Sequence, residues 1–212
     1  MFHHSLRGIP HSIIDSFRGR NLFWHALAIG LTCILVVSGF DWWYFRPTRS
    51  DTLRPLIMIA GLGGFLVPLV LPAIFWCVGA IRRDTHAVRV GWAVAQAAIA
   101  GWLISAAYKA LTGRIQPNGS DGVADISHNF QFGFLEHGVF WGWPSSHATV
   151  AFATAVTLFL FYRPHGLRWV AIFWALIVAF GASIGFHWFS DALAGAIIGT
   201  VVGTVVVHRF NT

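Results

Sequence analysis

Charged residues are scarce in this chain. Asp, Glu, Lys and Arg make up 10% of the 212 residues, whereas 56% are hydrophobic. A soluble domain carries roughly a quarter of its residues as charges, so this composition excludes that class and indicates a bilayer as the solvent. The formal net charge of +6 does not indicate nucleic-acid binding, because the basic residues form short clusters between apolar runs and not one charged face.

Cysteine is nearly absent as well. The two cysteines, Cys33 and Cys77, each lie inside an apolar stretch and lack the spacing of a zinc or redox motif. We therefore expect them to be packing residues.

Long polar segments are few, and between them lie six apolar runs. A spanning helix needs about 20 mostly apolar residues. The sequence therefore predicts an all-α, polytopic membrane protein, a bundle of six transmembrane helices that forms a single domain over residues 1–212. The second run contains three glycines and two prolines, which predicts a bent helix. The expected spans cover residues 22–40, 55–81, 88–111, 146–162, 167–186 and 188–208.

Short connectors separate all but one pair of the expected spans. The exception is the stretch 112–143, which is rich in Gly, Asp, Asn and His. It is too polar for lipid and too long for a turn, and loops of this kind are usually functional or disordered. Nine of the fourteen basic residues fall on the side of the two termini, so the positive-inside bias predicts cytoplasmic termini and an extracytoplasmic 112–143 loop. These nine are Arg7, Arg18, Arg20, Arg82, Arg83, Arg89, Arg163, Arg168 and Arg209. The short loops and lean length suggest a plasma (inner) membrane protein.

The first 21 residues are expected to be a cytoplasmic segment. Ile9, Ile13, Ile14 and Phe17 stand among polar residues, which suggests a short helix at the membrane surface. A disordered tail is the alternative.

Ionisable residues gather at the expected outer ends of the third, fourth and sixth spans, where they are costly unless functional. Lys109 closes the third span. The fourth opens with Ser145, Ser146 and His147, so a serine can cap a helix whose N-terminus favours a phosphate. His187 and Asp191 are four residues apart, on one helical face, so the carboxylate can hold one imidazole nitrogen and leave the other free to attack.

Three short motifs in this order resemble the type 2 phosphatidic acid phosphatase (PAP2) family, whose motifs are K-x6-R-P, P-S-G-H and S-R-x5-H-x3-D. The resemblance covers roughly residues 100–205. It departs from the family at four places. The matching positions are Lys109 and Pro117, then Pro144, Ser145 and His147, then His187 and Asp191; the departures are Gln116 for arginine, Ser146 for glycine, and Phe180 and Gly181 for serine and arginine.

The resemblance implies a lipid phosphatase that removes a phosphate from a lipid mono- or pyrophosphate at the extracytoplasmic leaflet. In such an enzyme His187 attacks phosphorus to form a phosphohistidine, Asp191 orients it, and His147 protonates the leaving group and then activates water. Lys109, Gln116 and the amides around Ser145 and Ser146 would bind phosphoryl oxygens, with Arg114 as an extra cation. The implied partner is a membrane lipid with a phosphate head group, and the implied mechanism needs no metal or other cofactor.

Two alternatives stay open. The missing arginines leave a site with few fixed positive charges, which favours a lipid phosphodiesterase or a phospho-head-group transferase, similar to the sphingomyelin synthase type with its His, His, Asp set. The second alternative is a non-enzymatic anion-binding or transport protein.

Other histidines are expected to be structural, with the loop as the exception. For His25, His86, His165 and His208 we favour interfacial or packing roles. His128, Glu136 and His137 of the 112–143 loop could instead join a metal site with His147, although their spacing matches no metal motif.

Overall fold

The computed structural model describes residues 6–48, 50–117, 124–162 and 165–211, which form helices and loops with no strand among them. The predicted all-α class is thus confirmed. Arg163 and part of the expected outer loop, residues 118–123, lie outside the described residues. The helices are α1 (Ile9–Ser16), α2 (Asn21–Val37), α3 (Phe40–Thr48), α4 (Arg54–Arg82), α5 (Thr85–Thr112), α6 (Ser146–Phe161), α7 (His165–Gly185) and α8 (Phe189–Asn211), with short 3-10 helices at Leu6–Gly8 and Asp51–Leu53.

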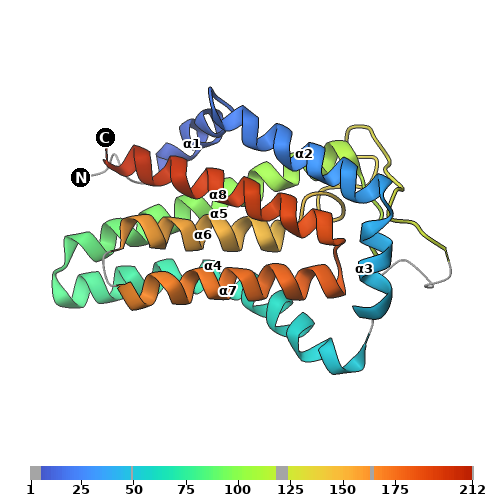
Figure 1. Cartoon of the computed structure of the whole chain (residues 1–212). Helices are drawn as coiled ribbons and strands as arrows, with labels where there is room; N and C mark the ends of the chain where they lie inside the picture. Colours follow the sequence, from blue (N-terminus) through green and yellow to red (C-terminus); the bar gives the residue numbers. More distant parts are fainter. Residues whose placement is uncertain (1–5, 49, 118–123, 163–164, 212) are drawn as a thin grey trace.

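Helix α6 forms the centre of the bundle and contacts α4, α5, α7 and α8 (Figure 1). Its closest neighbour is α8, because Gly195, Gly199 and Gly203 face it. A Cβ atom at Gly199 would lie 2.3 Å from the backbone oxygen of Thr149, so only glycine allows this approach. These three glycines therefore serve close packing within the chain.

The predicted number of six spans is not confirmed. Helices α4, α5, α7 and α8 are long and apolar enough to cross a membrane, and α1 with α2 makes a fifth span only as a pair bent by 68°. Helix α6 has 16 residues, about 24 Å, which is short for a hydrocarbon core of about 30 Å. Because other helices surround α6, it can be short without exposing its ends to lipid.

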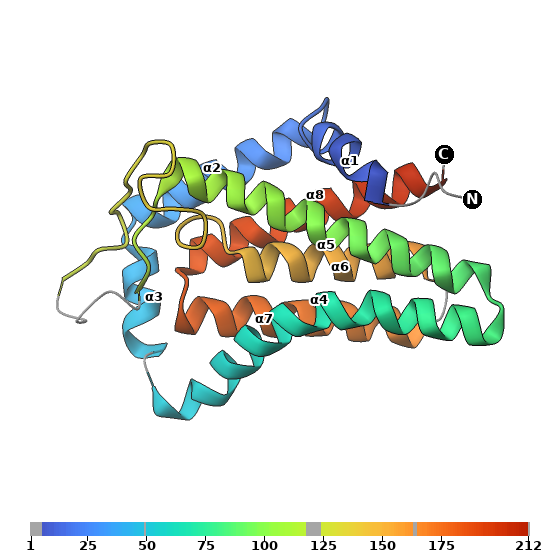
Figure 2. The same ribbon diagram turned by 180° about the vertical axis from the view of Figure 1, so that it is seen from behind.

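Helix α4 is bent, as its glycines and prolines predict. Pro68 and Pro72 lie inside it, and its N-terminal part turns away from the bundle (Figure 2). Many of its side chains, including Phe65 and Leu69, remain exposed in the isolated chain, as expected for a lipid-facing helix.

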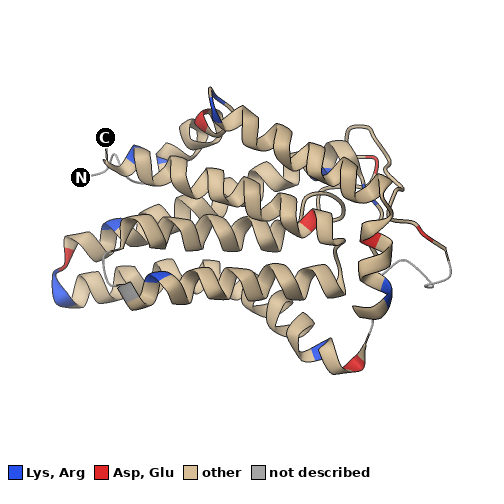
Figure 3. Ribbon diagram, viewed as in Figure 1, with Lys and Arg blue, Asp and Glu red and all other residues tan. Residues whose placement is uncertain are grey.

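The two ends of the bundle differ. Both termini lie at one end, and α3 crosses the other (Figure 1). Charged side chains gather at these two ends, with long uncharged stretches of helix between them (Figure 3). The N-terminal segment includes helix α1, which packs on α5 and α8; its location at a membrane surface stays a prediction.

Candidate active site

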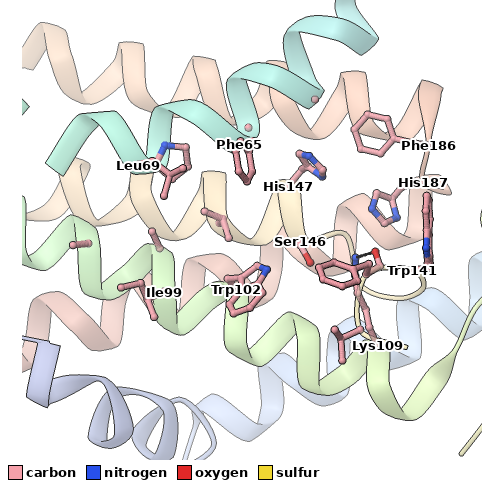
Figure 4. Close-up of a pocket in the computed structure, with 18 of the residues that line it drawn as sticks. Phe65, Leu69, Ile99, Trp102, Lys109, Trp141, Ser146, His147, Phe186 and His187 are labelled. Atoms are coloured by element: carbon pink, nitrogen blue, oxygen red, sulfur yellow. Dashed lines mark hydrogen bonds between the residues drawn. The ribbon is translucent and has the colours of Figure 1, made fainter. Parts of the chain in front are cut away.

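The end of the bundle crossed by α3 brings together the residues singled out by the sequence. Lys109 lies in the last turn of α5, His147 in the first turn of α6, and His187 in the short connection between α7 and α8. Figure 4 shows these three side chains around one cavity, together with Ser146.

The start of α6 is fixed by hydrogen bonds. Ser145 is the N-cap, and its hydroxyl accepts a bond from the amide of Ala148 at 3.4 Å, as the sequence predicts. The Ser145 amide donates to the backbone oxygen of Asp191 at 3.0 Å, which ties α6 to α8. Ser146 lines the cavity, and its hydroxyl lies 2.9 Å from that of Ser105. Of the two serines, Ser146 is therefore the one that faces the site.

His187 is held through one ring nitrogen. Its Nδ1 lies 3.3 Å from Oδ2 of Asp191, an oxygen that also accepts the amide of Trp188 at 3.2 Å. The amide nitrogen of Gln116 lies 3.2 Å from the same Nδ1, to which it can donate only while Nδ1 is unprotonated. When Nδ1 carries the proton and donates it to Asp191, Nε2 keeps the lone pair needed for attack.

The protonation of His187 favours the same role. The side chain is 2% exposed. Burial lowers the pKa of His187 below its ordinary value, and it outweighs the opposite effect of the hydrogen bond with Asp191. The ring is therefore neutral near pH 7, as a nucleophile must be.

His147 faces the same cavity from α6. Its ring centroid lies 6.5 Å from that of His187 and 4.8 Å from that of Phe186. On its other side it packs against α4, where a Cβ atom added to Gly64 would come within 2.9 Å of the ring carbon Cδ2. Its Nδ1 is buried and has no hydrogen-bond partner within the described part of the chain. The ring also makes a hydrogen bond with the backbone of Gly61 on α4.

Lys109 is the single lysine of the chain, and it is 2% exposed. Its ammonium donates a hydrogen bond of 3.0 Å to the backbone oxygen of Phe140. Both residues line the cavity. An ammonium can exchange one carbonyl for a phosphoryl oxygen without leaving the site.

Arg114 lies behind Asp191 and does not line the cavity. It is fully buried and uses all five of its N–H donors. Two go to Asp191 and Asp41, the latter at 2.7 Å, and three go to Ser190 and the backbone oxygen of Ser127. No donor is left for a substrate, so this geometry gives the expected extra cation of the phosphate site a different role, that of fixing Asp191.

Asp41 is the part of this network that sequence reasoning missed. It is fully buried in α3, and its carboxylate accepts from Arg114, from the Ser190 amide at 2.9 Å and from the Ser190 hydroxyl. We name Asp41, Arg114, Ser190 and Asp191 the buried charge network. The available signal was an aspartate at the very end of an apolar run, where it is costly unless paired.

The cavity itself has a volume of about 810 Å³ and two unlike ends. Its polar end is formed by the site residues. From there it follows α4 and α5 past Phe65, Leu69 and Trp102 to Ala95, a distance along α5 of about 21 Å from Lys109. Phe65, Leu69 and Trp102 are 64%, 61% and 46% exposed, so this apolar trough opens on the flank of the bundle.

The loop residues considered for a metal site are not assembled into one. His128 has a side chain 61% exposed, 3.9 Å from Asp125, and Glu136 is exposed. Within the described ranges, no group of three or more His, Cys, Asp or Glu is arranged to hold a metal ion. His25 is a packing residue, as expected, with its ring 2.9 Å from the Tyr108 hydroxyl and 3.1 Å from the Ser16 backbone oxygen.

Comparison with known proteins identifies the family of this chain. Neither the curated proteins nor the solved structures contain a match to this chain. The family model of the PAP2 superfamily matches residues 86–212, more than half of the chain and all of the site residues from Lys109 to Asp191. The chain therefore belongs to the PAP2 superfamily.

Proposed function

We propose that the protein cleaves the phosphate ester of a membrane lipid through a phosphohistidine on His187, at the extracytoplasmic leaflet. Superfamily membership supports phosphatase or phosphotransferase chemistry. The observation that carries the lipid part is the cavity, because it joins a site with His187, His147 and Lys109 to an apolar trough long enough for an acyl or prenyl chain. The positive-inside bias supports the outer leaflet.

The reaction has two steps. In the first, Nε2 of His187 attacks phosphorus, the P–O bond to the lipid alcohol breaks, and His147 gives a proton to the leaving oxygen. In the second, His147 takes a proton from water, which attacks phosphorus and releases His187. Asp191 holds Nδ1–H throughout. Lys109 and the N-terminus of α6 stabilise the negative charge on the phosphoryl oxygens.

Trapping of the covalent intermediate tests this proposal. The full-length protein is incubated with a lipid labelled at phosphorus and quenched under alkaline conditions, in which phosphohistidine survives, and its peptides are analysed by mass spectrometry. We expect label on the peptide that contains His187. The label and lipid turnover should disappear in His187→Ala and persist in His128→Ala, an exposed histidine outside the cavity.

Near-wild-type turnover in His187→Ala would contradict the mechanism. Absence of label with every lipid, together with anion binding, would favour the transport alternative, since transport requires no covalent intermediate.

A further inference from the structure

We infer that the site takes a lipid phosphodiester, whose phosphoryl group carries one negative charge, in preference to a phosphomonoester. This inference rests on the proposed function and specifies its substrate class. It follows from how few positive charges line the cavity and from how the nearby Arg114 is engaged by other residues.

The wall of the cavity offers one fixed positive charge. Among the described residues that line it, Lys109 is the only lysine or arginine. Gln116 stands beside His187 with a neutral amide, 3.2 Å from Nδ1. The phosphoryl group therefore meets one ammonium and uncharged hydrogen-bond donors.

Arg114 cannot serve as a second cation. Its five donors are engaged by Asp41, Asp191, Ser190 and Ser127, and it is fully buried. Turning it toward a substrate would leave two buried carboxylates unpaired, which is strongly unfavourable. The buried charge network has two carboxylates for one guanidinium, so its formal charge is −1 and it repels additional negative charge beside His187.

Helix α7 leaves no room for a basic side chain at Gly181. A Cβ atom there would lie 2.5 Å from both the Cβ of Ala60 and the backbone oxygen of Leu56. Helix α4 thus fills the space at this position. Arg54, two residues before Leu56 at the start of α4, is largely exposed. It lies 4.0 Å from Asp51 and does not line the cavity.

Charge balance then selects the substrate. A phosphomonoester carries between 1.5 and 2 negative charges near pH 7, roughly, whereas a diester carries one. Lys109 neutralises a diester completely. With a monoester, up to one further charge would remain next to Asp191 in a buried, low-dielectric site, where unpaired charge is costly.

The chemistry balances for a diester. Nε2 of His187 forms the N–P bond, the P–O bond to the lipid alcohol breaks, and the alcohol oxygen takes the proton of His147 while the head group stays on phosphorus. Water or an acceptor alcohol then gives a proton to His147 and attacks phosphorus, and the N–P electron pair returns to His187. The products are the lipid alcohol and a phosphorylated head group, or a new diester.

A matched pair of lipids tests the inference: a diacylglycerol monophosphate and its methyl ester with the same acyl chains. Both release diacylglycerol, so one assay measures kcat/KM for both, at equal mole fraction in mixed micelles with the full-length protein. We expect the methyl ester to be preferred by about tenfold or more, the effect of one unpaired charge in a partly buried site. A ratio of one or below overturns the inference.

Two variants of Gln116 sharpen the test. Gln116→Arg adds the missing charge and should shift the ratio toward the monoester by about tenfold, whereas Gln116→Met keeps the site neutral and should not shift it. An unchanged ratio in folded Gln116→Arg contradicts the charge argument. If neither lipid yields diacylglycerol above the His187→Ala background, the proposed function itself fails, which is a separate outcome from a preference for the monoester.

Discussion

At the scale of residues, the buried charge network determines how His187 is presented. Asp191 touches His187 with one oxygen and Arg114 with the other, and Arg114 is held in turn by Asp41. Because a buried arginine needs all its donors satisfied, Asp41 fixes the orientation of a carboxylate that it does not contact. It acts as a positioning residue.

Asp41→Asn should therefore impair both catalysis and folding. Removal of one charge from a buried pair costs about 3–5 kcal/mol of stability, and a looser Asp191 should lower kcat about tenfold while KM changes little. Thermal unfolding and steady-state kinetics measure the two effects. Asp51→Asn is the matched control, because Asp51 is fully exposed. A purely structural role would lower stability without lowering kcat in the folded fraction.

The sequence predicts part of this site and misses part for a physical reason. His187 and Asp191 share a helical face at a spacing of four, and Ser145 and His147 lie at a helix start, so local geometry is enough to identify them. The contact between Asp41 and Arg114 joins residues 73 positions apart. It depends on α3 lying across the end of the bundle, which hydrophobic periodicity does not encode.

At the scale of elements, α4 is more than a lipid-facing wall. Its Gly64 lies against His147 and against Val178 of α7, so the helix sets the position of the proton donor as well as the trough. Glycine is required there because any side chain would meet the imidazole.

Gly64→Ala should displace His147 and lower kcat by about tenfold or more, since a small misplacement of a catalytic group is costly. The added Cβ would lie 2.9 Å from the ring. Gly63→Ala is the control one residue away, where a Cβ makes an ordinary contact of 3.6 Å with Trp174. Steady-state kinetics of the two variants, with circular dichroism to compare helicity, make the comparison. Equal activity in both would show that His147 tolerates the shift.

The positions of the helices can be predicted from the apolar runs, whereas the number of helices that cross the bilayer cannot. All six runs are helical, yet α6 is short and α2 continues from α1 through a 68° bend. The length of an apolar run indicates whether a helix surrounded by lipid could span the bilayer. Because α6 is packed among four other helices, it does not need a full-length apolar run. This packing cannot be predicted from a local stretch of sequence.

At the scale of the whole molecule, both termini lie at the end opposite the site. The positive-inside bias then predicts a site that faces outward. In a variant without Cys33 and Cys77, His128→Cys should react with a membrane-impermeant maleimide on intact cells. Arg82→Cys, at the other end of α4, should react only after permeabilisation. The reverse pattern would place the site in the cytoplasm.

The flank opening of the trough has a kinetic consequence. Phe65, Leu69 and Trp102 are exposed apolar side chains at the opening of the cavity between α4 and α5, a flank that lipid would cover in a bilayer. If the substrate is the proposed lipid, it would enter there without leaving the membrane, so the protein would encounter it in two dimensions. Its effective concentration is the mole fraction of the lipid in the bilayer, and dilution with inert lipid slows turnover even when the amount of substrate in the sample is constant.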